Sequence, residues 1–249
     1  MALDENRKGI PIAKIVFSAT PNAKATHADY NGPLVQGLIE KWQVELGTPQ
    51  GEAFEFCVGM TDNDAKIWKL LVNIWPAIHL LLCRYHLWDC WKQGLNRYLK
   101  VIPKGESHTE ICHHLGKFLM AQLDTSDYTK AVDLYNSELA YLKQLGKQSG
   151  IAKKQSKGGL GFLAYFHSHL KVKELWQAWS MAGVNCAAEI LRTDPELIPK
   201  TNNFLENYNG RIKGKFFQPY QHGGRLPHLD VWVLLITVVM PHFFQELED

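Results

Sequence analysis

Apolar and polar positions follow two different periods along the first hundred residues: short apolar runs typical of buried strands, and longer stretches with helical spacing. A polar turn closed by Gly9 predicts a β-hairpin between a short strand at the start of the chain and a strand at 10–17. The elements predicted after this hairpin are a helix at 33–46, a strand at 54–60, a helix at 65–75, a strand at 78–82 and a helix at 84–99. This order predicts a mixed sheet with helices packed on it.

Strand signals vanish between about 105 and 199, where helical spacing of Leu, Tyr and Trp takes over. The pairs Ser149-Gly150 and Gly158-Gly159 are predicted to interrupt these helices. The α/β pattern then resumes with a helix that carries Glu206. The expected division of the chain is a first core segment at 1–104, an all-helical insertion at 105–199 and a last core segment at 200–249.

The composition suits a folded domain, and the positions of the charges say more about partners than their sum. With 249 residues, 46% of them hydrophobic, the chain can bury a sizeable core. The net charge is only +2, but 143–173 contains seven lysines and no acid, and 200–225 contains five basic residues and one acid, Glu206. Such stretches suit phosphate groups. For the 143–157 part, the alternative is a solvated surface loop.

The cysteines and the most apolar segment bear on the compartment. Five scattered cysteines without a framework spacing favour a reduced intracellular compartment over secretion. The apolar run at 231–240 is too short to cross a bilayer and predicts a buried helix instead. We therefore expect no membrane association.

Two acidic residues are the candidates for chemistry. Asp62 directly follows the apolar run 54–60, and Glu206 lies on a helix inside a basic stretch. A strand-end Asp with a helix-borne Glu is an arrangement that two-metal phosphoryl transfer can use, with Mg²⁺ or Mn²⁺ bound by carboxylate oxygens. The alternative for Asp62 is a helix N-cap, which Asp64 could share, and for Glu206 an ordinary surface carboxylate.

Four ordered motifs resemble the Mutator-like (MULE) DDE transposases, particularly the fungal type. Thr61-Asp62-Asn63-Asp64, followed by a helix, Trp75-Pro76 and a run ending in Cys83-Arg84-Tyr85-His86, is similar to the segment around the second acid of that family. The segment 201–213 resembles the one around the third acid. The turn at 4–13 and the segment 224–230 resemble two further family segments, so the likeness covers nearly the whole chain.

This resemblance implies an RNase H-like α/β fold with a large all-helical insertion, and metal-dependent cleavage and transfer of DNA strands. Asp62 and Glu206 would be the second and third catalytic acids, both metal ligands for Mg²⁺ or Mn²⁺. Further basic residues near Glu206 would contact the DNA backbone: Arg211, Lys213, Lys215 and Arg225. The implied partner is DNA at the element ends, with a second copy or a full-length transposase as a protein partner, and the implied compartment is the nucleus.

The first acid of the family pattern has no candidate in this chain, so the resemblance is to a family member truncated at the N-terminus, with the first strand of the fold missing. Two carboxylates hold a metal pair poorly, and we expect activity of the chain alone to be severely reduced or absent. The alternative function is a non-enzymatic DNA-binding or regulatory fragment. The loss of a central strand predicts either direct pairing of the strands at 10–17 and 54–60 or a marginally stable fold.

Cys83 and His86 match the Cys-x-x-His pair of the family. With Cys90 they fall at i, i+3 and i+7, which would place all three on one helix face. A structural zinc site needs four ligands, and no second Cys/His pair stands out although Cys112-His113-His114 is available. We therefore expect zinc not to bind, and Cys83 and His86 to pack beside the strand ends near the carboxylates.

Overall fold

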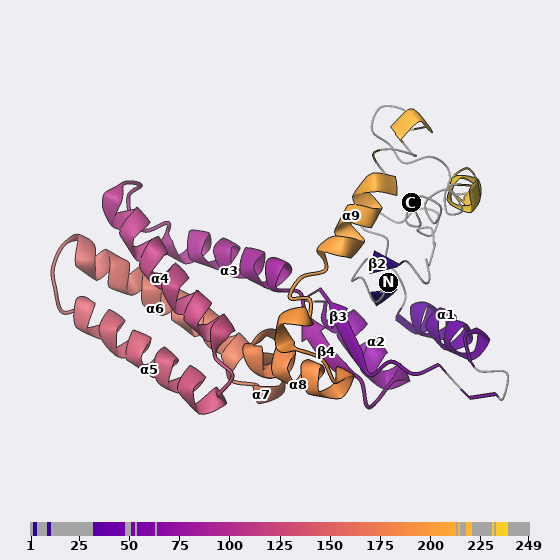
Figure 1. Ribbon diagram of the computed structural model, residues 1–249. Helices are drawn as coiled ribbons and strands as arrows, with labels where there is room; N and C mark the ends of the chain where they lie inside the picture. Colours follow the sequence, from indigo (N-terminus) through magenta and orange to yellow (C-terminus); the bar gives the residue numbers. More distant parts are fainter. Residues whose placement is uncertain are drawn as a thin grey trace. The chain divides into compact units, whose positions relative to one another are not determined.

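A computed structural model describes residues 2–3, 9–10, 32–47, 51–52, 54–62, 64–212, 214, 218–220, 231 and 233–238. The chain divides into two compact units (Figure 1), each of which is described by itself. One unit contains residues 54–201, and the other contains residues 1–53 and 202–249.

The strands of the 54–201 unit form a parallel pair. Strand β3 (Val58–Thr61) lies beside β4 (His79–Leu82), with Val58 opposite His79 and Thr61 opposite Leu82. Parallel strands need a crossover connection, and helix α2 (Ala65–Ile74) provides it. The α2 helix ends before Pro76, which cannot continue it. The helix predicted at 65–75 and the strand predicted at 78–82 are thereby confirmed.

The first of these strands is shorter than the apolar run predicted. Instead of a strand from residue 54, the structure has Phe54 and Phe56 in contact with each other and Phe56 edge-on to Trp75, at a centroid distance of 4.8 Å. The indole Nε1 of Trp75 donates a hydrogen bond of 2.9 Å to the Phe54 carbonyl. Aromatic packing at the end of α2 therefore takes the place of the first strand residues.

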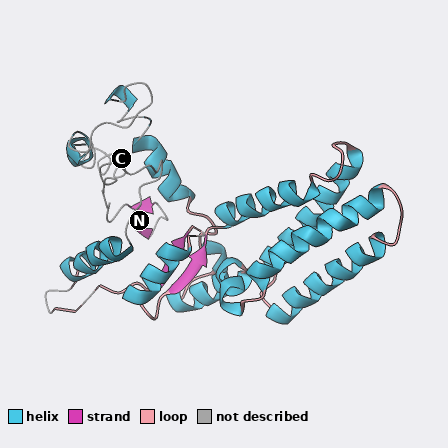
Figure 2. Ribbon diagram, turned by 180° about the vertical axis from the view of Figure 1, so that it is seen from behind, coloured by secondary structure: helices cyan, strands magenta, loops and turns pink. Residues whose placement is uncertain are grey.

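Helices make up the rest of this unit, as expected for 84–99 and 105–199 (Figure 2). They are α3 (Arg84–Leu99), α4 (Glu106–Asp124), α5 (Tyr128–Leu145), α6 (Ile151–Leu170), α7 (Lys173–Trp179) and α8 (Met181–Leu191), followed by the 3₁₀ turn η1 (Pro195–Leu197). A mixed α/β class with a large helical part is therefore correct. The boundary expected near 104 falls in the turn between α3 and α4, which belong to the same unit.

The core of the unit lies between α3, α4, α6 and α7. Trp91 of α3 is fully buried, and its ring packs edge-on against Phe166 of α6 and Trp179 of α7, both at 5.3 Å. One sequence prediction was wrong here, because Gly158-Gly159 lies within α6 and does not interrupt it. A side chain at either glycine would meet Leu99 or Leu142 at 3.0 Å or less, so their small size lets α3 and α5 approach α6 closely.

The other unit contains the predicted hairpin. Strand β1 (Ala2–Leu3) pairs antiparallel with β2 (Gly9–Ile10), while the rest of the predicted strand at 10–17 lies outside the described residues. Its helices in the described part are α1 (Gly32–Glu45), α9 (Asn203–Arg211), the 3₁₀ turn η3 (Gln218–Tyr220) and a segment of which residues 231 and 233–238 are described. This last segment is helical as predicted, but Leu234 is 63% exposed, so the expectation of a buried helix is wrong. No helix in the described part of the chain is both long and apolar enough to span a lipid bilayer.

Candidate functional site

The site lies at the carboxyl edge of the parallel strand pair. Because Thr61 and Leu82 are register partners at the ends of β3 and β4, the next residues, Asp62 and Cys83, leave the sheet at the same edge. The Cys83 N–H donates to the Thr61 carbonyl at 2.9 Å, and the Cys83 carbonyl accepts from Leu87 N at 3.1 Å as the first bond of α3. Cys83 therefore joins β4 directly to α3, and this edge is where ligands bind in open parallel sheets.

Asp62, Cys83 and His86 converge here although 21 residues separate the first two. The His86 Nε2 lies 3.2 Å from the Asp62 Oδ1. One donor atom from each of the three residues lies within 4.8 Å of the other two, and no other such His, Cys, Asp or Glu group occurs among the described residues. The Asp62 side chain is 53% exposed and the His86 side chain 34%, whereas Cys83 is 1% exposed. The carboxylate side of the group is therefore exposed to solvent, and its thiol side is buried.

The sequence left open whether Asp62 or Asp64 caps the helix that follows. In the structure, Asp64 is the N-cap of α2. Its Oδ1 accepts a hydrogen bond of 2.8 Å from Lys66 N at the start of α2, and its backbone is extended, as at an N-cap. Asp62 contributes its carbonyl, which accepts from Asp64 N at 2.8 Å, while its carboxylate reaches His86. The capping alternative for the Asp62 side chain is thus wrong, because the next carboxylate performs that role.

The N-terminus of α3 adds a favourable field for negative charge at this edge. The first turn of α3 contains no acidic side chain, and the N-cap Cys83 makes no side-chain capping bond. Unsatisfied N–H groups and the helix dipole give such an end a partial positive charge. Asp62 brings a carboxylate to it, and an anionic ligand such as a phosphate group would be stabilised by the same field.

The donor set determines which cations fit. Mg²⁺ prefers six oxygen ligands, and of the three donors only Asp62 offers oxygen. Zinc accepts carboxylate, thiolate and imidazole together, and sites with three protein ligands and an open fourth position are typical of catalytic zinc. With metal–ligand bonds of about 2.0 to 2.2 Å, a tetrahedron separates its nitrogen and oxygen vertices by about 3.4 Å. The 3.2 Å between His86 and Asp62 suits that edge.

A nucleophilic thiol beside a histidine base is another chemistry that these residue types can support. It requires a thiol that a substrate can approach. Cys83 is 1% exposed, beneath the end of β4 and the first turn of α3. Burial of this kind is compatible with metal ligation or packing and disfavours nucleophilic attack. Cys83 and His86 thus lie beside the strand ends near the Asp62 carboxylate, as expected, and Cys83 is almost completely buried.

Arg84, the residue after Cys83, anchors α3 to the end of α4. Its guanidinium donates to the Leu123 carbonyl at 3.0 Å and lies 3.8 Å from Asp124. Burial lowers the pKa of Arg84, and the neighbouring Asp124 opposes that shift. Sequence reasoning did not assign this residue a role, and its only signal was a charged side chain between two ligand candidates.

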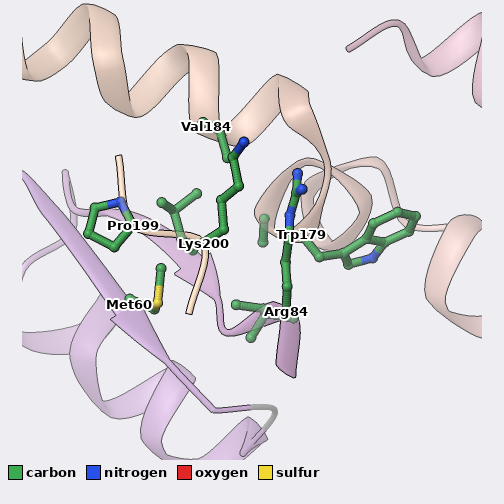
Figure 3. Close-up of a pocket in the computed structure, with 9 residues that line it drawn as sticks. Met60, Arg84, Trp179, Val184, Pro199 and Lys200 are labelled. Carbon is green, nitrogen blue, oxygen red and sulfur yellow. The ribbon is translucent and has the colours of Figure 1, made fainter. Parts of the chain in front are cut away.

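A shallow hollow lies beside Arg84 and contains none of the three donors (Figure 3). Its walls are mostly apolar side chains from the strands, α7 and α8, and the side chains of Arg84 and Lys200 extend alongside each other at its border. The Arg84 N–H donates to the Lys200 carbonyl at 2.9 Å, which ties the segment after η1 to the start of α3. The residues that line this hollow include no His, Cys, Asp or Glu that could bind a metal ion.

The remaining predicted site residues lie elsewhere. Glu206 is exposed in the first turn of α9, and Arg211 is in the last turn of the same helix. Both belong to the unit that does not contain Asp62, so the convergence of Asp62 and Glu206 stays a prediction. Lys213, Lys215 and Arg225 lie outside the described residues.

The other cysteine and histidine candidates do not join the group at Asp62. Cys90 is absent from the cluster of donor atoms. His114 contacts Glu138 of α5 at 2.9 Å, and Cys112 lies 3.6 Å from His108. A zinc site built from Cys83, His86, Cys90 and the 112–114 segment is therefore not formed, and the third donor is the carboxylate of Asp62.

Comparison of the chain with protein-family models, with curated proteins and with solved structures gives no match. The family resemblance therefore depends on the sequence motifs themselves.

Proposed function

We propose that this chain is a transposase-derived DNA-binding protein with an RNase H-like core, and that its carboxyl-edge site binds a divalent cation for cleavage and transfer of DNA strands. The observation that carries the proposal is the position of Asp62. It follows the end of β3, and its carboxylate lies 3.2 Å from His86 and within 4.8 Å of the Cys83 sulfur. The family resemblance adds Glu206 as a second proposed carboxylate ligand.

Each residue has a separate task in this proposal. Asp62 binds the cation through a carboxylate oxygen, His86 adds a nitrogen ligand, and Cys83 adds a thiolate ligand from beneath them. The N-terminus of α3 and the basic residues Arg211, Lys213, Lys215 and Arg225 position the phosphate backbone. A bound cation would stabilise the charge that develops on the attacked phosphate and activate water as the nucleophile. Element ends in the nucleus are the proposed substrate, and a second copy or a full-length transposase is the proposed protein partner.

The second candidate is a DNA-binding or regulatory fragment without catalysis. It is favoured by the exposed lysines of 143–157, which suit a phosphate backbone and need no metal. It is also favoured by the number of carboxylates, because Asp62 and Glu206 alone hold two dications poorly. In this reading, the chain would occupy the DNA ends that an active transposase uses.

Incubation of the full chain with labelled duplex DNA in Mn²⁺ or Mg²⁺, at several salt concentrations, separates the two candidates. The enzyme proposal predicts salt-sensitive binding, a nicked product with Mn²⁺, and loss of that product in Asp62→Asn. The Glu206→Gln variant should also lose the product while binding DNA as well as or better than wild type, because a carboxylate near phosphate repels it. Salt-sensitive binding without nicking favours the second candidate. Absence of DNA binding contradicts both.

A further inference from the structure

One end of the helical bundle gathers lysines from two turns of the chain and the helix ends beside them, far from Asp62 in the fold. The turn between α5 and α6 and the turn between α3 and α4 lie at the same end of the bundle (Figures 1 and 2). The exposed lysines of these turns, here called the lysine-rich end, are Lys100, Lys104, Lys143, Lys147, Lys153, Lys154 and Lys157. The α3 helix starts at the Asp62 site and ends at these lysines, and its 16 residues span about 24 Å.

Specific contacts hold these segments together. The Ser156 hydroxyl of α6 donates to the Leu142 carbonyl of α5 at 2.7 Å, so the next residues, Lys157 and Lys143, lie at the same level of the hairpin. The Gln155 amide of α6 donates to the Ser107 carbonyl at the start of α4 at 2.8 Å. The two turns are therefore fixed against each other, and the lysines belong to one surface.

The charge of this surface is unbalanced. In 100–110 and 143–157, seven lysines face only two acids, Glu106 and Glu110, which leaves five positive charges. Within the described part of the chain, none of the seven lysines forms an ion pair. A cluster of this kind raises the local potential and attracts anions with many charges.

The placement of three of these lysines opposes the stability of their own helix. Lys153, Lys154 and Lys157 lie in the first two turns of α6, where the helix dipole favours negative charge. Lys153 and Lys157 are also like charges at i and i+4, which destabilises a helix by a few tenths of a kcal/mol. A bound polyanion would reverse both unfavourable effects. Stability of the fold therefore does not account for the cluster.

The α6 helix, which carries three of these lysines, presents no apolar face to a bilayer. Ala152, Phe162 and Phe166 line the buried side of α6, which packs against its neighbours. Membrane-surface helices instead keep an apolar face exposed beside their lysines. Lysines, unlike arginines, act on phosphate as point charges without a bidentate fork, so their contacts carry no base specificity.

We infer that the lysine-rich end is a sequence-independent contact surface for the phosphate backbone of duplex DNA. This inference rests on the proposed function for the identity of its partner, and it assigns that partner a second contact about one helix length from the metal site.

The test measures salt-dependent binding of a fluorescent duplex by the full chain. The variant K143Q/K153Q/K154Q/K157Q removes four charges from the lysine-rich end. The matched control K117Q/K130Q/K171Q/K173Q removes four exposed lysines from other parts of the same unit. The first variant should flatten the slope of log K against log salt by about 2 to 4, and the control by less than about 1. The unfolding midpoint of the first variant should equal or exceed that of wild type, because three of its four removed charges oppose the α6 dipole and only Lys143, in the last turn of α5, favours its own helix dipole.

Three results would overturn this inference. An equal flattening of the salt slope in the two variants would show that only the total charge matters, while the proposed function would stand. Lysine-dependent binding to phosphatidylserine vesicles in place of duplex DNA would assign the surface to lipid. Failure of the wild-type chain to bind any duplex would remove the proposed function together with this contact.

Discussion

The helical bundle and the carboxyl edge of the strand pair share α3 but are built in opposite ways. In the middle of α3, Trp91 is fully buried among aromatic rings of α6 and α7. At its start, Asp62 and His86 stay partly exposed and meet through polar atoms 3.2 Å apart. The bundle thus buries apolar surface that stabilises the fold, and the edge supplies donors that a packed core would not tolerate without partners.

This contrast shows how one helix serves two purposes. The α3 helix is fixed along its length by the bundle, so its first turn holds His86 and the buried Cys83 in place beneath an exposed carboxylate. A site supported in this way tolerates polar substitution at the exposed residue and responds strongly to substitution in the core. The following predictions use that difference.

The largest effect is expected in the bundle. Trp91→Ala removes a fully buried indole from between Phe166 and Trp179 and should lower the free energy of unfolding by about 3 to 5 kcal/mol. Trp91→Phe should lower it far less, because the buried Trp91 Nε1 has no hydrogen-bond partner among the described residues and its loss relieves that penalty. Urea unfolding followed by circular dichroism measures both.

A loss below about 1 kcal/mol for Trp91→Ala would mean that the bundle does not depend on this cluster. The contrast between core and edge would then fail at its strongest point.

A smaller effect on stability is expected from His169, a histidine in the last turn of α6. Its ring lies 5.0 Å from that of Tyr165 and 6.3 Å from that of Trp91. Burial lowers the pKa of His169 from its usual 6.5, and hydrogen bonds with the backbone of Tyr165 and Phe166 oppose the shift in part. Above pH 6.5 the histidine is neutral in both states. As the pH falls below 6.5, the unfolded chain takes up the proton first, so stability is lost.

Thermal unfolding between pH 7.5 and 5 should therefore show a midpoint temperature that decreases as the pH is lowered. This decrease should be smaller in His169→Phe. The difference between the two proteins isolates this residue from the other histidines. A steeper fall in the variant would show that the His169 pKa is raised in the folded state.

Elements defined by periodicity were predictable from the sequence. The helix from Arg84 to Leu99 and the strand ending at Leu82 were placed within one residue, because buried apolar runs and polar turns mark such elements directly. Local residue spacing gave wrong predictions where tertiary packing determines whether an element continues. Gly158-Gly159 was read as a break, whereas the close approach of α3 and α5 requires two small residues inside α6. The strand expected from residue 54 starts at Val58, because Phe54 and Phe56 pack at Trp75 instead.

The site was predictable in part. Asp62 could be singled out because it directly follows a predicted strand, and Cys83 and His86 because they match the Cys-x-x-His pair of the resembled family. Their proximity was expected from that resemblance alone, because it depends on the parallel register of Thr61 with Leu82 and on the capping of α2 by Asp64, which periodicity does not encode. The role proposed for Glu206 stays a prediction from the family resemblance, because Glu206 and Asp62 belong to different units.

Metal titration of the full chain tests the central claim, that Asp62, Cys83 and His86 form a divalent-cation site. Calorimetry should show saturable binding near one equivalent, tighter for Zn²⁺ than for Mn²⁺ at this mixed donor set. Asp62→Asn and Cys83→Ser should each weaken it more than about tenfold. His108→Ala should leave it unchanged and controls for the Cys112–His108 pair of α4. Asp62→Asn should change the free energy of unfolding by less than about 1 kcal/mol. Binding that persists unchanged in a folded Asp62→Asn protein would contradict the account.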